Sequence, residues 1–216
     1  EQLRSGLEAG LAASRLYPAS LTVQGTPRRL VARVEGLAPR QPNMEQVSRG
    51  PAASIAYDES GQPTRAALGF ARGKGIDVSD LRQQDFDGKA YVVSVTLDQG
   101  RGAAAVLAEL LPRVCAGMRF GKSMRWNESG VSFSRPIRWM VALLGDRVVP
   151  FEYAGVQSGR TTRGIRPGGS QLIALDSVAA YEPALAGEDI LLDVSDREAS
   201  ITHAATALAA SAGGSL

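Results

Sequence analysis

The stretch from Met124 to Pro150, MRWNESGVSFSRPIRWMVALLGDRVVP, constrains the fold more than any other part of the chain. Large apolar residues occupy alternate positions between Ile137 and Leu144, which is the period of a β-strand. Gly145-Asp146 is the kind of pair that a two-residue hairpin loop needs, and residues 148–151 supply a returning strand. A helix over the same apolar run is the alternative, but the turn pair favours a hairpin.

Both tryptophans of the chain, Trp126 and Trp139, directly follow an arginine within this stretch. Between them lies Phe133-Ser134-Arg135-Pro136, where the proline imposes an extended conformation on Arg135. We interpret the stretch first as aromatic packing, with arginines stacked over the indoles. The alternative is a platform of rings and arginines that binds unpaired bases or an RNA backbone.

These motifs resemble the β subunit of the bacterial two-subunit glycyl-tRNA synthetase. The signature of that family reads approximately MRW, a short polar loop, F-x-RP-x-R-W, an aliphatic strand and VVPFE. The elements TPRRL (26–30) and ALGFARGKGI (67–76) resemble the family as well. The resemblance covers nearly all 216 residues and corresponds to the N-terminal region of a β subunit, or of a fused α–β chain. One departure is clear: the family continues with TRGHRF, whereas Gly164 is followed here by Ile165-Arg166-Pro167, so no role of that histidine is carried over.

The resemblance implies a part in the ATP-dependent ligation of glycine to its tRNA. In the family the α subunit is similar to a class II catalytic core and uses ATP and Mg²⁺, while the β subunit contributes tRNA recognition and completes the assembly. The implied partners are the α subunit, tRNA(Gly) and further β-subunit domains. We therefore expect no catalytic residue, cofactor or metal site in this chain, and no activity from it alone. A non-catalytic RNA-binding module and a subunit-docking scaffold are the alternatives.

Positive charge is concentrated in the middle of the chain. Residues 119–166 contain nine Arg or Lys and three acids, whereas residues 171–216 contain seven acids and only Arg197. A basic segment beside an acidic one suggests a surface for a polyanion, and the resemblance supplies tRNA as that polyanion. The candidate tRNA-binding residues are Arg125, Arg135, Arg138, Arg160 and Arg163. The competing interpretation is that these arginines pair with acids such as Asp193 and Asp196.

Two paired arginines outside this segment, Arg28 and Arg29, stand beside Pro27 in a predicted turn between strands. They could hold a phosphate, but a solvated loop is the favoured interpretation. The sole histidine, His203, has no ligand-type neighbour and is read as a surface residue. Cys115 lies in the apolar stripe of a predicted helix and is read as a buried structural thiol.

We predict an α+β fold with mixed or antiparallel sheets, packed helices and two lobes. The segments are an N-terminal α+β lobe (1–118), a basic β-rich lobe (119–194) and the start of a helical segment (195–216). Further strands are expected at 21–24, 30–34, 91–97, 172–175 and 190–194, and helices at 1–14, 64–75, 106–115 and from 176 or 177. The last helix is expected to begin with a capping box over Ser195–Glu198 and to turn Ile201, Ala204, Ala205 and Leu208 inward.

Composition is that of an ordinary soluble protein, with 44% hydrophobic and 21% charged residues. No apolar run approaches the roughly 20 residues that a membrane-spanning helix needs. A single cysteine allows no internal disulfide, which suits a reducing compartment. The first residues, EQLRSGLEAG, lack the pattern of a signal peptide. We expect a cytoplasmic protein without a membrane partner.

Overall fold

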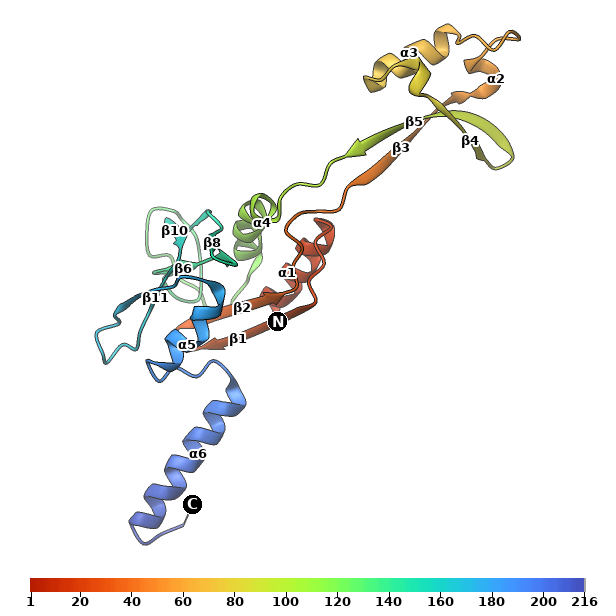
Figure 1. Cartoon of the computed structure of the whole chain (residues 1–216). Helices are drawn as coiled ribbons and strands as arrows, with labels where there is room; N and C mark the ends of the chain where they lie inside the picture. Colours follow the sequence, from red (N-terminus) through yellow and green to blue (C-terminus); the bar gives the residue numbers. More distant parts are fainter. Residues whose placement is uncertain (216) are drawn as a thin grey trace. The chain divides into compact units, whose positions relative to one another are not determined.

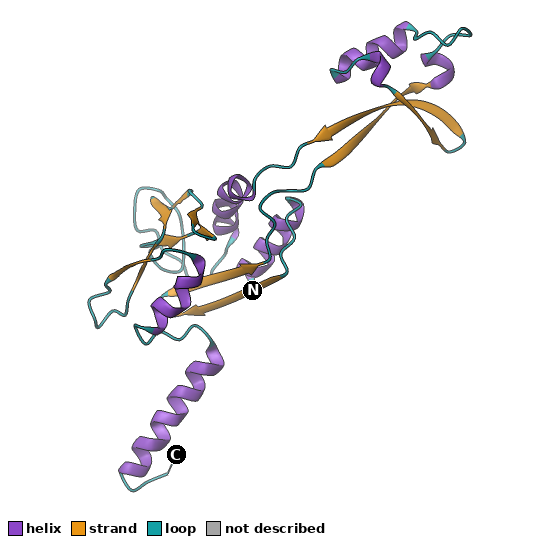
Figure 2. Ribbon diagram, in the orientation of Figure 1, coloured by secondary structure: helices purple, strands orange, loops and turns teal. Residues whose placement is uncertain are grey.

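The computed structural model describes residues 1–215, which form two compact units. Unit 1 consists of residues 1–40 together with residues from 101 onward, and unit 2 consists of residues 41–100. Helices and small, mostly antiparallel sheets occur in both, so the predicted α+β class is confirmed (Figures 1 and 2). These units are defined by how the chain packs, whereas the predicted segments were defined by sequence pattern and charge. The division into residues 1–118, 119–194 and 195–216 stays a prediction.

Unit 1 begins with α1 (Gln2–Ala13) and an antiparallel hairpin of β1 (Ser20–Thr26) and β2 (Arg29–Glu35). The chain returns from unit 2 into α4 (Ala103–Gly117), which contains Pro112 within one continuous helix. The predicted helices at 1–14 and 106–115 and both predicted strands are therefore confirmed.

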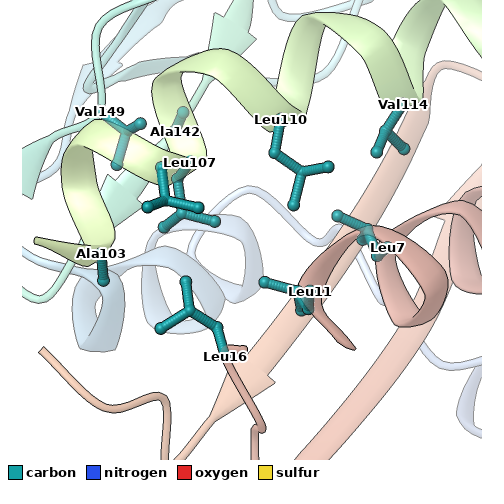
Figure 3. Close-up of a cluster of buried hydrophobic side chains, with 10 residues drawn as sticks. Leu7, Leu11, Leu16, Ala103, Leu107, Leu110, Val114, Ala142 and Val149 are labelled. Atoms are coloured by element: carbon teal, nitrogen blue, oxygen red, sulfur yellow. The ribbon is translucent and has the colours of Figure 1, made fainter. Parts of the chain in front are cut away.

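The core of unit 1 forms where α1 packs on α4 (Figure 3). Leu7 and Leu11 of α1 meet Leu110 and Val114 of α4, and all four side chains are buried. Gly10 permits the close approach, because a Cβ atom at this position would lie 2.3 Å from Cδ1 of Leu110. The apolar stripe at four-residue spacing in α1 is thus the face that builds this core.

The predicted hairpin around Gly145-Asp146 is present, with β7 (Leu143–Leu144) antiparallel to β8 (Arg147–Val148). The preceding strand is shorter than predicted, since only β6 (Met140–Val141) is formed before it and residues 137–139 are not strand. The apolar run is also divided where the partner strand changes, at Ala142. Its N–H donates to the carbonyl of Gly159, whereas its own carbonyl accepts from the N–H of Val149. One apolar run therefore serves two small sheets.

Four further strands complete this part of unit 1. β10 (Val156–Gly159) lies between β6, to which it is parallel, and β9 (Glu152–Tyr153), to which it is antiparallel. β11 (Thr161–Arg163) pairs with β12 (Leu172–Ala174), as predicted for residues 172–175. The helix expected next is divided into a 3₁₀ turn, η2 (Val178–Ala180), and α5 (Tyr181–Ala186).

Two predictions near the end of the chain are wrong. Residues 190–193 form no strand; Ile190 and Leu192 are buried beside Leu185, and this alternating burial imitates a strand pattern in sequence. The helix α6 (Val194–Ser211) begins earlier than the predicted capping box, because the Asp193 carboxylate accepts hydrogen bonds from the N–H groups of residues 195 and 196.

The predicted inward face of α6 is also not inward within the described chain. Ile201 and Leu208 are 68% and 70% exposed, and no side chain of α6 is buried. His203 is exposed, as predicted.

Unit 2 is a three-stranded antiparallel sheet of β3 (Met44–Ala52), β5 (Lys89–Asp98) and β4 (Arg82–Phe86), with β5 in the centre. The helices α2 (Ala53–Ala56) and α3 (Arg65–Lys74) and the 3₁₀ turn η1 (Val78–Asp80) accompany it. The predicted helix at 64–75 and strand at 91–97 are confirmed, with Thr64 as the helix cap and Gly75 ending the helix in the left-handed region at φ 69°.

No helix among residues 1–215 is long and apolar enough to cross a membrane.

The α1–α4 contact generates a stability prediction. Leu11 is 1% exposed, so Leu11→Ala removes buried apolar surface and leaves a cavity, and we expect it to lower the free energy of unfolding by about 2–5 kcal/mol. Leu208→Ala is the matched control, since the same change at a side chain 70% exposed should cost about 0.5 kcal/mol or less. Urea denaturation measures both, and equal effects would contradict the assignment of Leu11 to the core.

Candidate nucleic-acid interface

Three arginines surround the half-buried indole of Trp139. Arg28 lies in the turn between β1 and β2, and Arg29 is the first residue of β2. Arg163 is the last residue of β11. Their guanidinium carbons lie 6.0, 5.6 and 6.0 Å from the indole centroid, within the range of cation–π attraction. These four residues are called the Trp139 cluster below.

Arg29 holds the cluster together. Its guanidinium donates hydrogen bonds to the carbonyl oxygens of Arg163 and Gly164, the latter at 3.4 Å. The hairpin is thereby attached to the end of β11, a segment far away in sequence. Burial lowers the pKa of Arg29; nearby Tyr181 opposes this shift and the positive charge of Arg28 adds to it. Arginine nevertheless stays protonated at neutral pH, so the buried group is a cation.

The positive charge of the cluster is not balanced by carboxylates. Within residues 1–215, none of the ion pairs involves Arg28, Arg29 or Arg163. Arg28 instead donates to the hydroxyl of Ser170 at 3.3 Å. The Nε atoms of Arg29 and Arg163 are buried and have no hydrogen-bond partner in the described chain. Partly buried cations without a counter-ion, here Arg29 and Arg163, cost free energy that a bound anion would recover.

One carboxylate does lie close to the same loop. Glu188 accepts from the N–H of Ile165 at 3.4 Å, and a Cβ atom on Gly164 would be 2.1 Å from its Oε2. Glu188 therefore packs against the backbone after Arg163 and restricts Gly164 to glycine, rather than pairing with a guanidinium of the cluster.

The five arginines predicted to contact tRNA do not form one site. Arg163 belongs to the Trp139 cluster. Arg160 donates to the carbonyls of Asp146 (3.0 Å), Leu175 (3.3 Å) and Asp176 (3.4 Å), and so connects the β7–β8 turn to the end of β12. These bonds indicate a structural role for Arg160.

The other three predicted arginines are exposed. Arg125 donates from Nε to the carbonyl of Gly130 at 3.1 Å, which braces its own loop. Arg135 and Arg138 are solvent-exposed, and Arg138 does not lie over the indole beside it, since the cations over Trp139 come from other elements. The predicted stacking of arginine on indole is thus present at Trp139, with different arginines.

The competing interpretation, in which the basic segment pairs with Asp193 and Asp196, has no support among the ion pairs of residues 1–215. Asp193 caps α6 and accepts from the amide of Gln24 at 3.2 Å. Its pKa is lowered first by the Ser195 hydroxyl and then by the Asp196 N–H and the Gln24 amide. An arginine outside the segment, Arg33, makes the link to α5 through Glu182 at 2.8 Å.

Sequence reasoning set aside the two arginines that matter most here. The preference for a solvated loop at TPRRL is wrong for Arg29, which is half-buried, and holds only for the exposed Arg28. A usable signal existed, because Arg29 directly precedes the strand expected at 30–34, whereas Arg28 stands beside Pro27 in the turn.

No group of three or more metal-ligating side chains exists in the described part of the chain. Burial raises the pKa of Cys115 to about 11, so the thiol is protonated at neutral pH, in agreement with a structural role.

Comparison with known proteins gives a consistent result. A family model described as "Glycyl-tRNA synthetase beta subunit" matches residues 1–216. The "Glycine--tRNA ligase beta subunit" of Desulfitobacterium hafniense strain Y51 is 39% identical over 213 residues, covering 99% of this chain and 31% of that protein. The same-named protein of Citrifermentans bemidjiense is 48% identical over 153 residues, which are 71% of this chain and 22% of the relative.

A plant protein is similar over the whole chain. The "Glycine--tRNA ligase, chloroplastic/mitochondrial 2" of Arabidopsis thaliana is 40% identical over 216 residues, which make up 20% of its length. The chain therefore spans about a third of the length of the bacterial relatives that it matches throughout, and less of the plant one.

The contacts of Arg29 generate a prediction about the paired arginines. Arg29→Lys keeps the charge but loses the planar fork that reaches two carbonyls, so we expect it to lower the free energy of unfolding by about 1–3 kcal/mol. Arg28→Lys, at the exposed neighbour, is the control and should change stability by about 0.5 kcal/mol or less. Chemical denaturation compares the two, and equal stability of both variants would show that Arg29 does not hold the hairpin to β11.

Proposed function

Because the chain belongs to the glycyl-tRNA synthetase beta subunit family, we propose that it supports the ligation of glycine to its tRNA by binding the tRNA backbone at the Trp139 cluster. The observation that carries the proposal is the set of three guanidinium groups around one indole without a carboxylate partner. Arginine forks match phosphate oxygens, and Arg29 and Arg163 are already partly removed from water, which lowers the cost of binding a phosphate beside them.

The cluster suits a phosphate backbone better than a base edge. Arg29 is fixed by the two carbonyls it contacts, so it contributes charge at a set position, while Arg28 is exposed at the tip of the hairpin and free to adjust. Contacts of this kind set the position and orientation of a nucleic acid and carry no sequence information. We assign the cluster a positioning role in tRNA binding, with Arg28 and Arg163 as the principal contacts. Arg125, Arg135 and Arg138, all exposed, are secondary candidates, and Arg160 is a structural residue.

Activation of glycine is assigned to the α subunit. That step needs a set of arginines and carboxylates around ATP and Mg²⁺, and we propose that the α subunit holds both ligands. The remaining partners are tRNA(Gly) and the other β-subunit domains, and the proposed compartment is the cytoplasm.

Subunit docking is the second candidate function, and α6 is the observation that favours it. Val194, Ile201 and Leu208 follow one another at seven-residue spacing and are 64%, 68% and 70% exposed. Such a stripe is typical of a helix that packs against another helix. The two functions are compatible, because α6 and the Trp139 cluster use different residues.

The first test concerns the tRNA contacts. Arg28→Gln and Arg163→Gln in the assembled synthetase should each lower the salt dependence of tRNA binding by about 0.9 in slope and raise the KM for tRNA. Glycine-dependent ATP–pyrophosphate exchange should be unchanged. Arg113→Gln, the same change on α4, is the control. Earlier unfolding with unchanged tRNA affinity would mean that these arginines serve only the fold.

The second test concerns the division of labour. The purified chain alone should support neither ATP–pyrophosphate exchange with glycine nor charging of tRNA, because both steps need the α subunit under this proposal. Addition of α subunit and the remaining β domains should restore both activities. Exchange activity in a preparation free of α subunit would overturn the assignment.

A further inference from the structure

We propose that the side of the unit 2 sheet that carries no helix binds unpaired nucleotides of RNA by stacking on an arginine–tyrosine pair. This side is called the open face. The inference goes beyond the function proposed above, because it concerns residues 41–100 and not the Trp139 cluster.

The two sides of the sheet are distinguished by register and burial. Val92 of β5 packs with Ala67 and Ala71 of α3, and a Cβ atom on Gly50 would lie 2.6 Å from the ring of Phe70 in the same helix. The even-numbered positions of β5 therefore face the helices. In Figure 1, α2 and α3 lie together near the end of the sheet where β4 pairs with β5.

The alternate positions form the open face. Val93 of the central strand has Arg49 of β3 and Arg82 of β4 as its direct cross-strand neighbours. Val93 itself is 1% exposed, and these two arginines are the side chains beside it on the neighbouring strands. Long arginine stems are suited to covering it, since they lie over apolar surface while the charged group stays in water.

Two aromatic rings and a guanidinium adjoin on this face. The guanidinium carbon of Arg49 lies 3.5 Å from the ring centroid of Tyr91 and 5.2 Å from that of Phe86. The two rings are 6.0 Å apart and nearly perpendicular, at 76°. At 3.5 Å the guanidinium is stacked on the tyrosine, and a stacked guanidinium presents a flat cationic surface on which a base can lie.

The charge of the open face is complementary to phosphate. Arg49, Arg82 and Lys89 are exposed, and within residues 1–215 no ion pair involves them. The acid within β4, Asp85, pairs with Ala90 and so lies on the helix side. Glu45, which pairs with Leu97 near the far end of the sheet, is the acid in register with the open face. Cations thus surround the rings.

This combination favours single-stranded RNA over a duplex or a protein. Rings and guanidinium planes bind bases without regard to sequence, but only where the bases are unpaired and can reach them. A duplex would present phosphates to the cations and leave the rings unused. A protein partner would use the apolar end of the sheet, where Val47 and Leu97 are 46% and 55% exposed, rather than the cations.

The test uses the chain of residues 1–216 and a fluorescent eight-nucleotide oligouridylate, with a blunt RNA duplex of the same length for comparison. Fluorescence anisotropy should show tighter binding of the single strand. Tyr91→Leu, which keeps apolar cover but removes the ring, should weaken this binding roughly tenfold. Arg49→Gln should also lower the salt slope by about 0.7. Arg72→Gln, the same charge change on α3, is the matched control and should retain full affinity.

A further variant of the open face separates loss of RNA binding from loss of folding. Lys89→Gln changes an exposed side chain at the strand end and should lower the salt slope without changing the thermal unfolding of the protein. Arg163→Gln should leave the difference in oligouridylate affinity between otherwise wild-type protein and Tyr91→Leu unchanged, so failure of the Trp139 cluster and failure of the open face give different results. The proposal is overturned if wild type does not bind the oligonucleotide, or if Tyr91→Leu binds as wild type does. Equal affinity for strand and duplex would likewise refute stacking and point to a simple charged surface.

Discussion

The packing of α1 against α4 is the contact on which the rest of unit 1 depends. These helices belong to two parts of the chain separated by the whole of unit 2, so their contact closes a long loop, at an entropic cost that burial of Leu7, Leu11, Leu110 and Val114 must offset. Where the chain returns to unit 1, the N–H of Ala103 donates to the carbonyl of Pro39 at 2.9 Å. Once the helices are packed, the β1–β2 hairpin and the strands after residue 139 can share one core.

The Trp139 cluster combines stability and charge in the same side chains. Arg29 contributes hydrogen bonds that attach the hairpin to β11, yet its burial beside Arg28 and Arg163 concentrates positive charge in a partly dry environment. Apolar residues could join these elements without that cost. A cluster that keeps three cations, and satisfies them with carbonyls and an indole instead of carboxylates, stays attractive to an anion. This is why the same contacts support both a fold and a proposed phosphate site.

The open face of unit 2 uses similar chemistry with a different balance. Arg49 stacks on Tyr91 at 3.5 Å, whereas the cations of the Trp139 cluster lie at 5.6–6.0 Å from the indole. Arg49 is exposed, while Arg29 is fixed by two carbonyls. The arrangement at Arg49 suits reversible stacking of a base, and the Trp139 cluster suits a phosphate held at a set position. Under both proposals, each unit offers RNA a different kind of contact.

Elements whose signals are local could be predicted from the residues alone. The leucine stripe of α1, the cap and terminal glycine of α3, the hairpin at Gly145-Asp146 and the family of the chain could all be read from neighbouring residues, because periodicity, capping and turn chemistry act over a few positions. Signals of this kind fail where a partner is distant. The division of one apolar run at Ala142 depended on backbone groups of Gly159 and Val149.

Which arginines share a site depends on long-range packing. Arg29 and Trp139 are far apart in sequence. Their approach follows from the core beneath the hairpin and from the pairing of β11, and neither can be predicted from the residues next to Arg29 or Trp139. Arg138, next to the indole in the chain, is exposed and is not among the cations over the ring. The local sequence therefore predicted the kind of contact, arginine beside an indole. Long-range packing determined which arginines make it.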